Sequence, residues 1–258
     1  MFDLFLDFFA NRENRLTLMD PRTKMIVASS LILAVILSTK VTLPMIVLVL
    51  CVSIMLVIGV PFKIVFLRLI APLSIILALV IIQTFSLNGN GFFSFTLFGQ
   101  HFVATHEGLW HGVMLASRVL GAVSVMILLG AVTPAHRIFH ALRWFKVPDT
   151  WVEIALLIYR YTFTLADQTS DISEAQKLRL GYSSVRTTLS SIGVLAGTVI
   201  TRSIDQAMRT YEAMTLRGYN GAMRFESLPK IPKMEFMGLL IVLPLIFASY
   251  CIAERWPK

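Results

Sequence analysis

The sequence predicts an all-α polytopic membrane protein with about five transmembrane helices and a long helical segment between the fourth and the fifth. Hydrophobic residues make up 56% of the 258 residues, charged residues only 15%, and the mean hydropathy is +0.75. A soluble domain carries roughly 25% charged residues, so part of this chain requires lipid around it. The apolar runs lack a period of two, which favours membrane helices over membrane strands.

A transmembrane helix needs about 20 predominantly apolar residues. We expect such helices at residues 24–40, 43–60, 68–87, 109–132 and 235–253. The first stretch is short, but Asp20 and Pro21 precede it, and these residue types favour a helix N-cap and a first helical turn. We therefore expect this helix to begin at Pro21.

The segment between the fourth and fifth spans, residues 133–233, contains no uninterrupted apolar run of spanning quality. Its apolar residues recur at helical spacing, which predicts amphipathic helices. We expect these helices at residues 134–146, 150–180 and 189–217. The chain then divides into membrane helices one to four (1–132), this helical segment (133–233) and the last membrane helix (234–258).

Two local patterns in this segment make further predictions. Thr150-x-x-Glu153 is a capping-box pattern, which places a helix N-terminus at Thr150. A sixth transmembrane helix at residues 189–204 is an alternative, but serines and a threonine interrupt that run and Arg202 follows it directly. We expect this stretch to lie outside the membrane.

The loop between the third and fourth spans, residues 88–108, alternates phenylalanine and leucine with serine and threonine and then reaches Gly99. This alternation before a glycine predicts a short β-hairpin at the membrane surface. The loop contains no lysine or arginine.

Lysine and arginine are distributed unevenly between alternate loops. If residues 133–233 are cytoplasmic, nineteen of the 23 cations lie in cytoplasmic segments and three lie outside. The positive-inside rule therefore predicts a cytoplasmic N-terminus, a cytoplasmic 133–233 segment and an external C-terminus. The cations of this segment are interleaved with acidic residues, so we expect a lipid bilayer and no nucleic acid among the partners.

The sequence offers no constellation for catalysis or metal binding. No G-x-x-x-x-G-K-[ST] motif is present to hold a nucleotide. His101, His106 and His111 are five residues apart and do not share one helix face, whereas His136 and His140 share a face but have no third ligand nearby. We expect no catalytic residue, no metal site and no cofactor in this chain.

Two further features lie inside predicted helices. Arg118 is near the middle of the fourth span, where a charge is costly and commonly serves a function. It has no intramembrane carboxylate to pair with, so we expect a polar contact with another helix or subunit. Gly193-x-x-x-Gly197 either permits a close helix crossing or is simply tolerated in its helix.

An internal repeat ends both long helices of the segment. Residues 174–179 (EAQKLR) and 212–217 (EAMTLR) share Glu, Ala, Leu and Arg at an offset of 38, and Gly-Tyr follows each copy within two residues. Glycine there favours a helix stop, which places Arg179 and Arg217 in the last turns. The arginines could merely offset the helix dipoles. The matching flanks favour two equivalent sites for two copies of a partner that presents carboxylates.

These motifs resemble the transmembrane T component of energy-coupling factor (ECF) transporters, in its CbiQ-type cobalt/nickel branch. The resemblance covers nearly the whole chain in the right order. It rests on Asp20-Pro21-Arg22-Thr23-Lys24, Tyr159-Arg160-Tyr161, Ala175-Gln176-x-x-Arg179 and Ala213-x-x-x-Arg217-Gly218-Tyr219. Two departures are Leu216 in place of the usual alanine, and Leu180 between Arg179 and Gly181.

The resemblance implies a non-catalytic scaffold subunit of an ATP-driven importer for cobalt, or for nickel. Its implied partners are two ATP-binding ATPase subunits and a substrate-binding membrane subunit. The residues implied in ATPase docking are Ala175, Gln176, Arg179, Gly181, Ala213, Arg217 and Gly218. A T component serving a vitamin-binding subunit is an alternative, and a membrane-embedded enzyme is a weaker one because Arg118 alone is ionisable within the spans.

Overall fold

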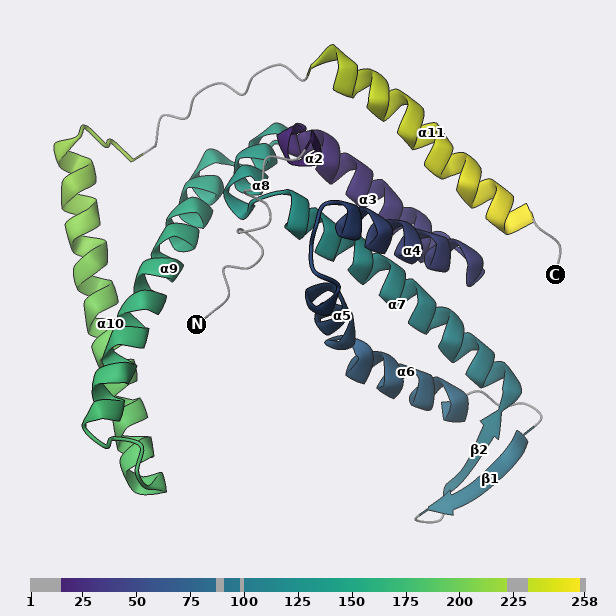
Figure 1. Ribbon diagram of the computed structural model, residues 1–258, viewed down its shortest axis with the longest axis horizontal. Helices are drawn as coiled ribbons and strands as arrows, with labels where there is room; N and C mark the ends of the chain where they lie inside the picture. Colours follow the sequence, from purple (N-terminus) through teal and green to yellow (C-terminus); the bar gives the residue numbers. More distant parts are fainter. Residues whose placement is uncertain (1–14, 87–90, 98–99, 222–231, 256–258) are drawn as a thin grey trace. The chain divides into compact units, whose positions relative to one another are not determined.

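The computed structural model describes residues 15–86, 91–97, 100–221 and 232–255 (Figure 1). Contacts divide the chain into two compact units. The elements up to Ala135 and the last helix form the first, called here the membrane unit. The elements that follow His136 form the second, called the long-helix unit.

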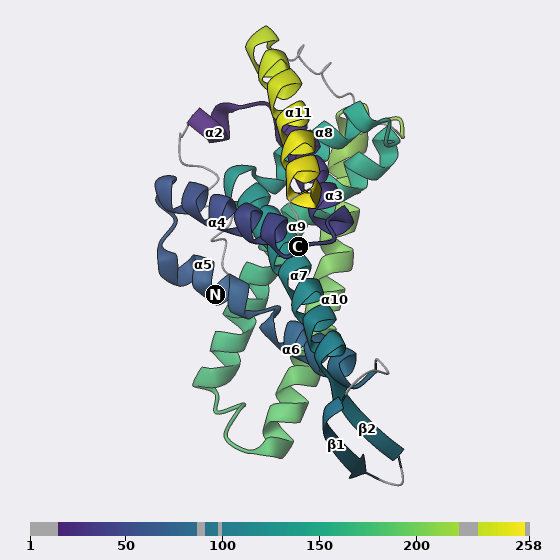
Figure 2. The same ribbon diagram turned by 90° about the vertical axis from the view of Figure 1, so that its right-hand side faces the viewer.

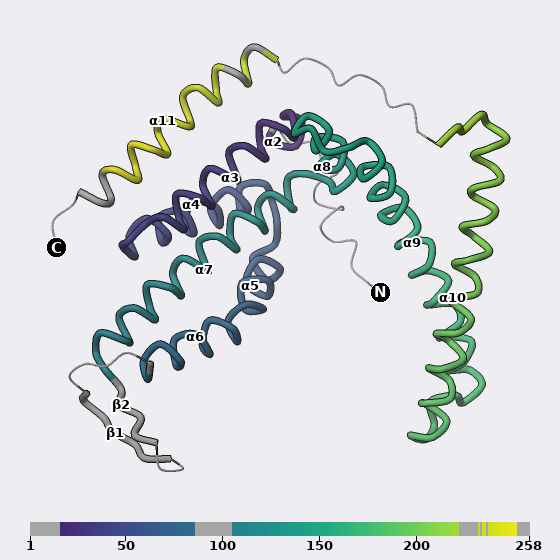
Figure 3. Tube along the Cα trace, turned by 180° about the vertical axis from the view of Figure 1, so that it is seen from behind, coloured from purple at the N-terminus to yellow at the C-terminus, as the bar shows by residue number. Residues whose placement is uncertain are grey.

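The membrane unit is helical apart from one hairpin (Figures 1 and 3). Its elements are α2 (Arg15–Leu18), α3 (Pro21–Leu37), α4 (Thr42–Val57), α5 (Phe62–Ile70), α6 (Leu73–Ser86), β1 (Gly91–Leu97), β2 (Gln100–Thr105), α7 (His106–Val132) and α11 (Lys233–Arg255). Helix α7 packs against α3, α4 and α6, and α11 packs against α3 and α4. The core of this unit therefore forms around α7, with Val35, Cys51, Met55, Val65 and Val125 buried.

Helix α3 begins at Pro21, as predicted. Asp20 is its N-cap, and the Asp20 carboxylate accepts a hydrogen bond of 2.9 Å from the Arg22 backbone N–H. The capping carboxylate satisfies one backbone donor of the first turn, and proline at the first position loses no helical hydrogen bond.

The third predicted span, residues 68–87, is wrong in its start and its continuity. The apolar helical stretch runs from Phe62 to Phe85, and it turns at Ala71 and Pro72 between α5 and α6. Ala71 keeps α-helical dihedral angles, but Pro72 has no backbone N–H and its ring clashes with the carbonyl one turn earlier, so the helical hydrogen bonding of α5 is interrupted there. The prediction counted apolar residues and gave no weight to Pro72.

Two helical stretches in the described part of the chain are long and apolar enough to cross a membrane. They are Phe62–Phe85, with a mean hydropathy of 2.7, and His106–Val132, with 2.1. Helix α4 and residues Met237–Cys251 are shorter apolar helices. Large apolar side chains point outward on α4, α6 and α11, as on a surface that lipid covers: Val49, Leu50, Ile75, Leu77, Ile82, Leu240, Leu245 and Phe247. The protein is an all-α membrane protein.

Glycines of α7 allow α6 to lie directly against it. A Cβ atom on Gly108 would stand 2.6 Å from the Gln83 carbonyl oxygen, and one on Gly112 would stand 3.1 Å from the Val80 Cα. The spacing Gly108-x-x-x-Gly112 is the small-residue pattern through which membrane helices approach closely. The sequence reasoning missed this pair.

The predicted hairpin is confirmed. Strands β1 and β2 form a hairpin (Figure 2). They pair antiparallel, and the Cα of Phe95 lies opposite that of Phe102. They connect α6 to α7. Gly99, where the turn was expected, lies outside the described residues.

The long-helix unit consists of α8 (Ala135–Leu142), the 3₁₀ turn η1 (Arg143–Phe145), α9 (Asp149–Leu178) and α10 (Val185–Leu216). The boundary between the two units falls after Ala135, the first residue of α8. Helices α9 and α10 have 30 and 32 residues and form an antiparallel pair joined by a short turn (Figure 3). Neither is among the described helices that are apolar enough to cross a membrane. The sixth-span alternative therefore has no support.

The predicted capping box at Thr150 is wrong. Helix α9 begins at Asp149, its N-cap is Pro148, and no side chain caps it. Asp149 supplies the acidic residue of the first turn, where a negative charge faces the positive end of the helix dipole. Glu153 is only 5% exposed and serves another contact, described below.

Candidate functional site

The two repeated arginines occupy the same position at the ends of two helices. Arg179 is the C-cap of α9, with φ −90° and ψ 15°, and Arg217 is the C-cap of α10, with φ −90° and ψ 11°. Both side chains are exposed. The exposed Ala175 and Ala213 lie one helical turn earlier. The offset of 38 residues therefore corresponds to an equivalent local structure.

The first helix end is closed by two backbone hydrogen bonds. The Gly181 N–H donates to the Gln176 carbonyl at 2.9 Å, and the Leu180 N–H donates to the Lys177 carbonyl at 3.0 Å. Leu180 has φ 58°, in the left-handed region. Together these features define a Schellman motif.

The second helix end has the same two backbone hydrogen bonds at equivalent positions. The Tyr219 N–H donates to the Met214 carbonyl at 3.0 Å, and the Gly218 N–H donates to the Thr215 carbonyl at 2.9 Å. Gly218 has φ 83°. Leu180 therefore stands where the second copy has glycine, and the residue between Arg179 and Gly181 does not change the backbone around the arginine.

A leucine next to each arginine is almost completely exposed. Leu178 is 87% and Leu216 89% exposed, in equivalent positions of the repeat. Arginine is enriched among the residues that carry the binding energy of protein–protein contacts, and an exposed leucine beside it adds apolar area that a partner could cover. The sequence reasoning noted the shared leucine and gave it no role, because its exposure cannot be read from helical spacing.

The turn between α9 and α10 is held by Gln176. Its side-chain amide donates to the Ser191 carbonyl at 3.0 Å, and its amide oxygen accepts from the Tyr182 hydroxyl at 2.8 Å. The Ser191 hydroxyl donates to the Gly181 carbonyl at 2.9 Å. Gln176 was expected at a docking surface, and the structure places its half-buried side chain inside the turn.

The far end of α10 is fastened to the start of α9 by Tyr219 and Glu153. The hydrogen bond from the Tyr219 hydroxyl to the buried Glu153 carboxylate raises the pKa of Tyr219, and burial adds to this rise. Both effects favour the neutral phenol, which keeps the donor that the carboxylate needs. This contact holds the residue that follows Gly218.

A groove of about 580 Å³ runs between α9 and α10. The Tyr161 hydroxyl and the Thr210 hydroxyl share a hydrogen bond of 2.7 Å across the two helices. The Arg160 guanidinium lies 5.9 Å from the centre of the Tyr161 ring. The Tyr159-Arg160-Tyr161 motif therefore lies along the helix pair, and Tyr161 lines the same groove as Met214 and Tyr219 near the Arg217 end of α10.

In the membrane unit, the Asp20-Pro21-Arg22 motif is part of a polar network with Glu235 of α11. The Glu235 carboxylate accepts from the Asp20 backbone N–H at 2.9 Å and from the Thr23 hydroxyl at 3.1 Å. Arg22 is buried, and its Nε lies 3.7 Å from the Asp20 carboxylate. The motif joins the start of α3 to the start of α11.

Two cations fasten α3 and α7 to each other, each at the carboxyl end of the opposite helix. The Lys24 ammonium donates to the Val132 carbonyl at the end of α7, at 3.3 Å. The Arg118 Nε donates to the Ser38 carbonyl at the end of α3, at 2.8 Å. A positive charge satisfies the last carbonyls of a helix and faces the negative end of its dipole. Arg118 thus makes the expected kind of polar contact, with another helix of this chain.

Gly193 and Gly197 make no helix crossing within the described residues. Added Cβ atoms at these positions would meet no atom within 4 Å. The close crossing in this structure is at the glycines of α7. A crossing at Gly193 and Gly197 would need another chain.

Comparison with known families identifies the chain. A family model described as cobalt transport protein, CbiQ, matches residues 12–229. The chain belongs to the CbiQ family. An uncharacterised protein of Methanocaldococcus jannaschii is 30% identical over 226 residues, covering 87% of this chain and 84% of that protein.

Two relatives with descriptive names match shorter parts of this CbiQ-family protein. The cobalt transport protein CbiQ of Rhodobacter capsulatus is 33% identical over 115 residues, covering 45% of this chain and 47% of its own length. The putative fused cobalt transport protein CbiMQ of Methanocorpusculum labreanum is 27% identical over 152 residues, covering 58% of this chain and 25% of its own.

Potential metal ligands of this CbiQ-family protein lie apart from one another in the part of the chain that the structure describes. Within the described residues, no three His, Cys, Asp or Glu side chains come together as a metal site. His136 and His140 lie on α8. Burial, and then the neighbouring His136 and Arg143, lower the pKa of His140, so its neutral form is favoured.

Proposed function

We propose that this chain is the transmembrane scaffold subunit of an ATP-driven ECF-type importer for cobalt, or less readily nickel. It would join two ATPase subunits to a substrate-binding membrane subunit and would perform no catalysis. The observation that carries this proposal is the pair of equivalent, exposed Leu–Arg helix ends. Two equal surfaces on one chain suit two copies of one partner.

The positions of the two arginines support two separate partners. Arg179 lies at the turn of the α9–α10 pair, and Arg217 lies at the opposite end of α10. Helix α10 has 32 residues, which corresponds to a length of roughly 48 Å. One small domain could not readily contact both arginines at this separation.

The partner sites are expected to present carboxylates next to an apolar pocket. Arginine offers a planar fork that binds a carboxylate through two parallel hydrogen bonds. Leu178 and Leu216 would enter the apolar part of each site. Motion of the ATPase subunits would then act on α9 and α10 together, because Tyr219, Tyr161 and the turn join the two helices.

The membrane partner is supported by one of the relatives. The Methanocorpusculum labreanum protein is named as a fusion of two cobalt transport parts, and this chain covers 25% of it. A CbiQ-like part joined to a second transport part is compatible with a scaffold that works beside a substrate-binding subunit.

The test of the proposed function is reconstitution. Purified chain alone should hydrolyse no ATP, and hydrolysis together with uptake of labelled Co²⁺ into vesicles should appear only when the partner subunits are present. Inhibition of Co²⁺ uptake by added Ni²⁺ would show whether nickel is also a substrate. ATP turnover by the isolated chain, with contaminating ATPases excluded, would contradict the scaffold function.

The proposed orientation places the N-terminus and residues 133–233 in the cytoplasm and the C-terminus outside. It is supported by the distribution of nineteen cations against three. In a variant without Cys51 and Cys251, a cysteine at Ser183 should react only from the cytoplasmic side and one at Asn90 only from outside. A membrane-impermeant maleimide measures this, and reaction of both from the same side would refute the orientation.

A further inference from the structure

A basic stretch of the chain begins where it leaves α7. Residues 135–148, called here the basic arm, contain His136, Arg137, His140, Arg143 and Lys146 and no acidic residue. Helix α7 ends only three residues before α8 begins. Three residues span at most about 10 Å, so the arm starts close to the end of a membrane-crossing helix.

The basic side chains of α8 share one face of the helix, on which Arg137 carries the permanent positive charge. At 100° per residue, His136, Arg137 and His140 fall within one sector, opposite Ile138 and Phe139. The apolar face is occupied within the unit, because Phe139 packs edge-to-face with a tyrosine of α9 at 6.0 Å between ring centres. His136 and Arg137 are exposed, so the basic face is the one open to a ligand.

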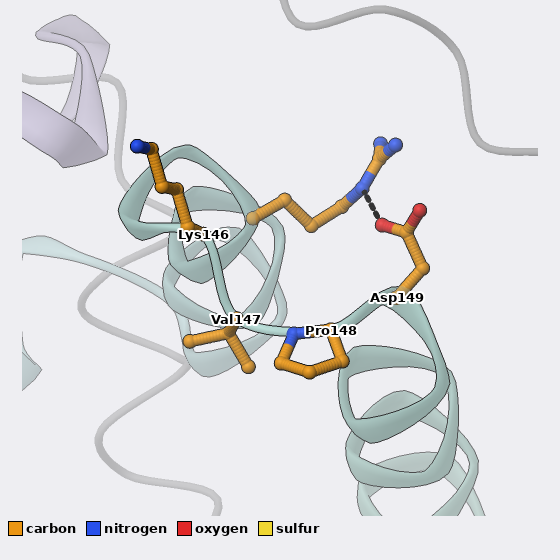
Figure 4. Close-up of a pocket in the computed structure, with 5 residues that line it drawn as sticks. Lys146, Val147, Pro148 and Asp149 are labelled. Carbon is orange, nitrogen blue, oxygen red and sulfur yellow. Dashed lines mark hydrogen bonds and ion pairs between the residues drawn. The ribbon is translucent and has the colours of Figure 1, made fainter.

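The end of the arm forms a hollow, and Figure 4 shows Lys146, Val147, Pro148 and Asp149 along it. Lys146 has φ 62°, and this left-handed residue turns the chain before α9. The hollow measures about 340 Å³ and is lined by Arg143, Lys146, Val147, Pro148 and Asp149. Arg143 is held in place because its Nε donates to the Asp149 carboxylate at 2.7 Å.

Two aromatic residues lie in sequence between Arg143 and Lys146, the two cations that line the hollow. Trp144 is 46% and Phe145 43% exposed, and their rings pack edge-to-face at 5.0 Å between centres. Exposed aromatic rings beside lysine and arginine are typical of segments that lie in the interface between headgroups and acyl chains.

We propose that the basic arm binds the headgroups of anionic phospholipids. The phosphate of a headgroup would lie between Arg143 and Lys146, with Trp144 and Phe145 among the upper acyl segments. Arg137 adds a positive charge on the same arm. This binding site is separate from the arginines at the helix ends and does not depend on the proposed ATPase docking.

Substitution of Asp149 provides a second test, in which lipid binding should change in the opposite direction. Its carboxylate orients Arg143 but also repels a phosphate placed in the hollow. Asp149→Asn keeps a hydrogen-bond acceptor and removes the negative charge, so it should strengthen lipid binding. Lys146→Gln removes one juxtamembrane cation and should weaken binding roughly fivefold.

The experiment titrates the purified full-length protein in neutral detergent with phosphatidylglycerol and, separately, with phosphatidylcholine. Native mass spectrometry counts the bound lipids. The triple variant Arg137→Gln/Arg143→Gln/Lys146→Gln should lose phosphatidylglycerol affinity by at least tenfold and keep its phosphatidylcholine binding. The matched control removes three exposed cations of α10 in Arg186→Gln/Arg202→Gln/Arg209→Gln and should bind as wild type does.

Several outcomes would overturn the proposal. These are equal affinity for the two lipids in wild type, an equal loss in the control triple, or weaker binding by Asp149→Asn. Inorganic phosphate at millimolar concentration should not displace the lipid, and full displacement would show a phosphate site that needs no membrane. If the triple variant does not fold, Lys146→Gln alone decides, because its exposed side chain makes no core contact.

Discussion

Replacing both Arg179 and Arg217 by alanine should abolish recovery of the ATPase subunits while the membrane helices stay folded and inserted. Removing one member of an interfacial charge pair costs on the order of 2–5 kcal/mol, partly because the partner's charge is left unpaired. Two contacts on one scaffold also raise each other's effective concentration, so losing both removes this gain as well. Pull-down of the ATPase subunits at equal membrane abundance measures the effect.

The single variants separate docking from helix capping. Arg217→Ala or Arg179→Ala should leave some complex assembled and impair transport. Lysine at either position should rescue poorly, because it lacks the planar fork. Arg186→Ala/Arg209→Ala removes two exposed cations elsewhere on α10 and serves as the matched control. Equal recovery by wild type and by the Arg179/Arg217 double variant would mean that the two arginines only cap their helices.

Gly181→Val should open the turn between α9 and α10, whereas Leu180→Gly should close it more tightly. A Cβ atom at 181 would stand 2.9 Å from the Gln176 carbonyl oxygen and 2.7 Å from the Ser191 hydroxyl. The backbone must move to relieve this clash, and the bonds through Gln176 and Ser191 weaken with it. We expect a cost of about 2 kcal/mol in local stability.

Leu180→Gly should raise the local stability of the turn because Leu180 has φ 58°. A left-handed conformation costs a side-chain-bearing residue about 1–2 kcal/mol, and glycine avoids this cost while losing some unfolded-state entropy. The net gain should be about 0.5–1 kcal/mol. Gly218 has φ 83°, so its substitution by alanine should lower the local stability of its helix end.

Hydrogen exchange of the peptide across the α9–α10 turn measures these local opening free energies. Exchange should be roughly 30-fold faster in Gly181→Val and slower in Leu180→Gly. Gly197→Val is the matched control, because its Cβ would meet no atom within 4 Å. Similar exchange in the two valine variants would contradict the close contact of Gly181 with Ser191.

The helices could be predicted from sequence where the deciding interactions are local. The N-cap at Asp20 acts within two residues, and the α3 start was correct to the residue. Arg179 and Arg217 were placed at helix ends by the glycines that follow them. The equal backbone of the two ends could not be predicted, because nothing in the sequence shows that Leu180 adopts a left-handed conformation.

The failures come from interactions between distant segments. Thr150 and Glu153 fit a capping box, yet Glu153 contacts Tyr219, 66 positions along the chain. Gly193 and Gly197, whose role the sequence left open, contact no other helix of the described chain, whereas Gly108 and Gly112, which the sequence reasoning missed, lie against α6. A short sequence pattern indicates which contacts a residue can make. Which of these contacts forms depends on the helix that packs beside it.

The reciprocal contacts of Lys24 and Arg118 restrict how the membrane unit can move. A slip of α3 along α7 by one helical turn, about 5.4 Å, would separate both cations from their carbonyls at once. A slip toward the helix interior would bring each cation to carbonyls that already accept in the helical ladder, whereas only the last turn offers carbonyls without a ladder partner. The two contacts therefore favour one register of α3 against α7 and oppose sliding more than they oppose a tilt of the two helices together.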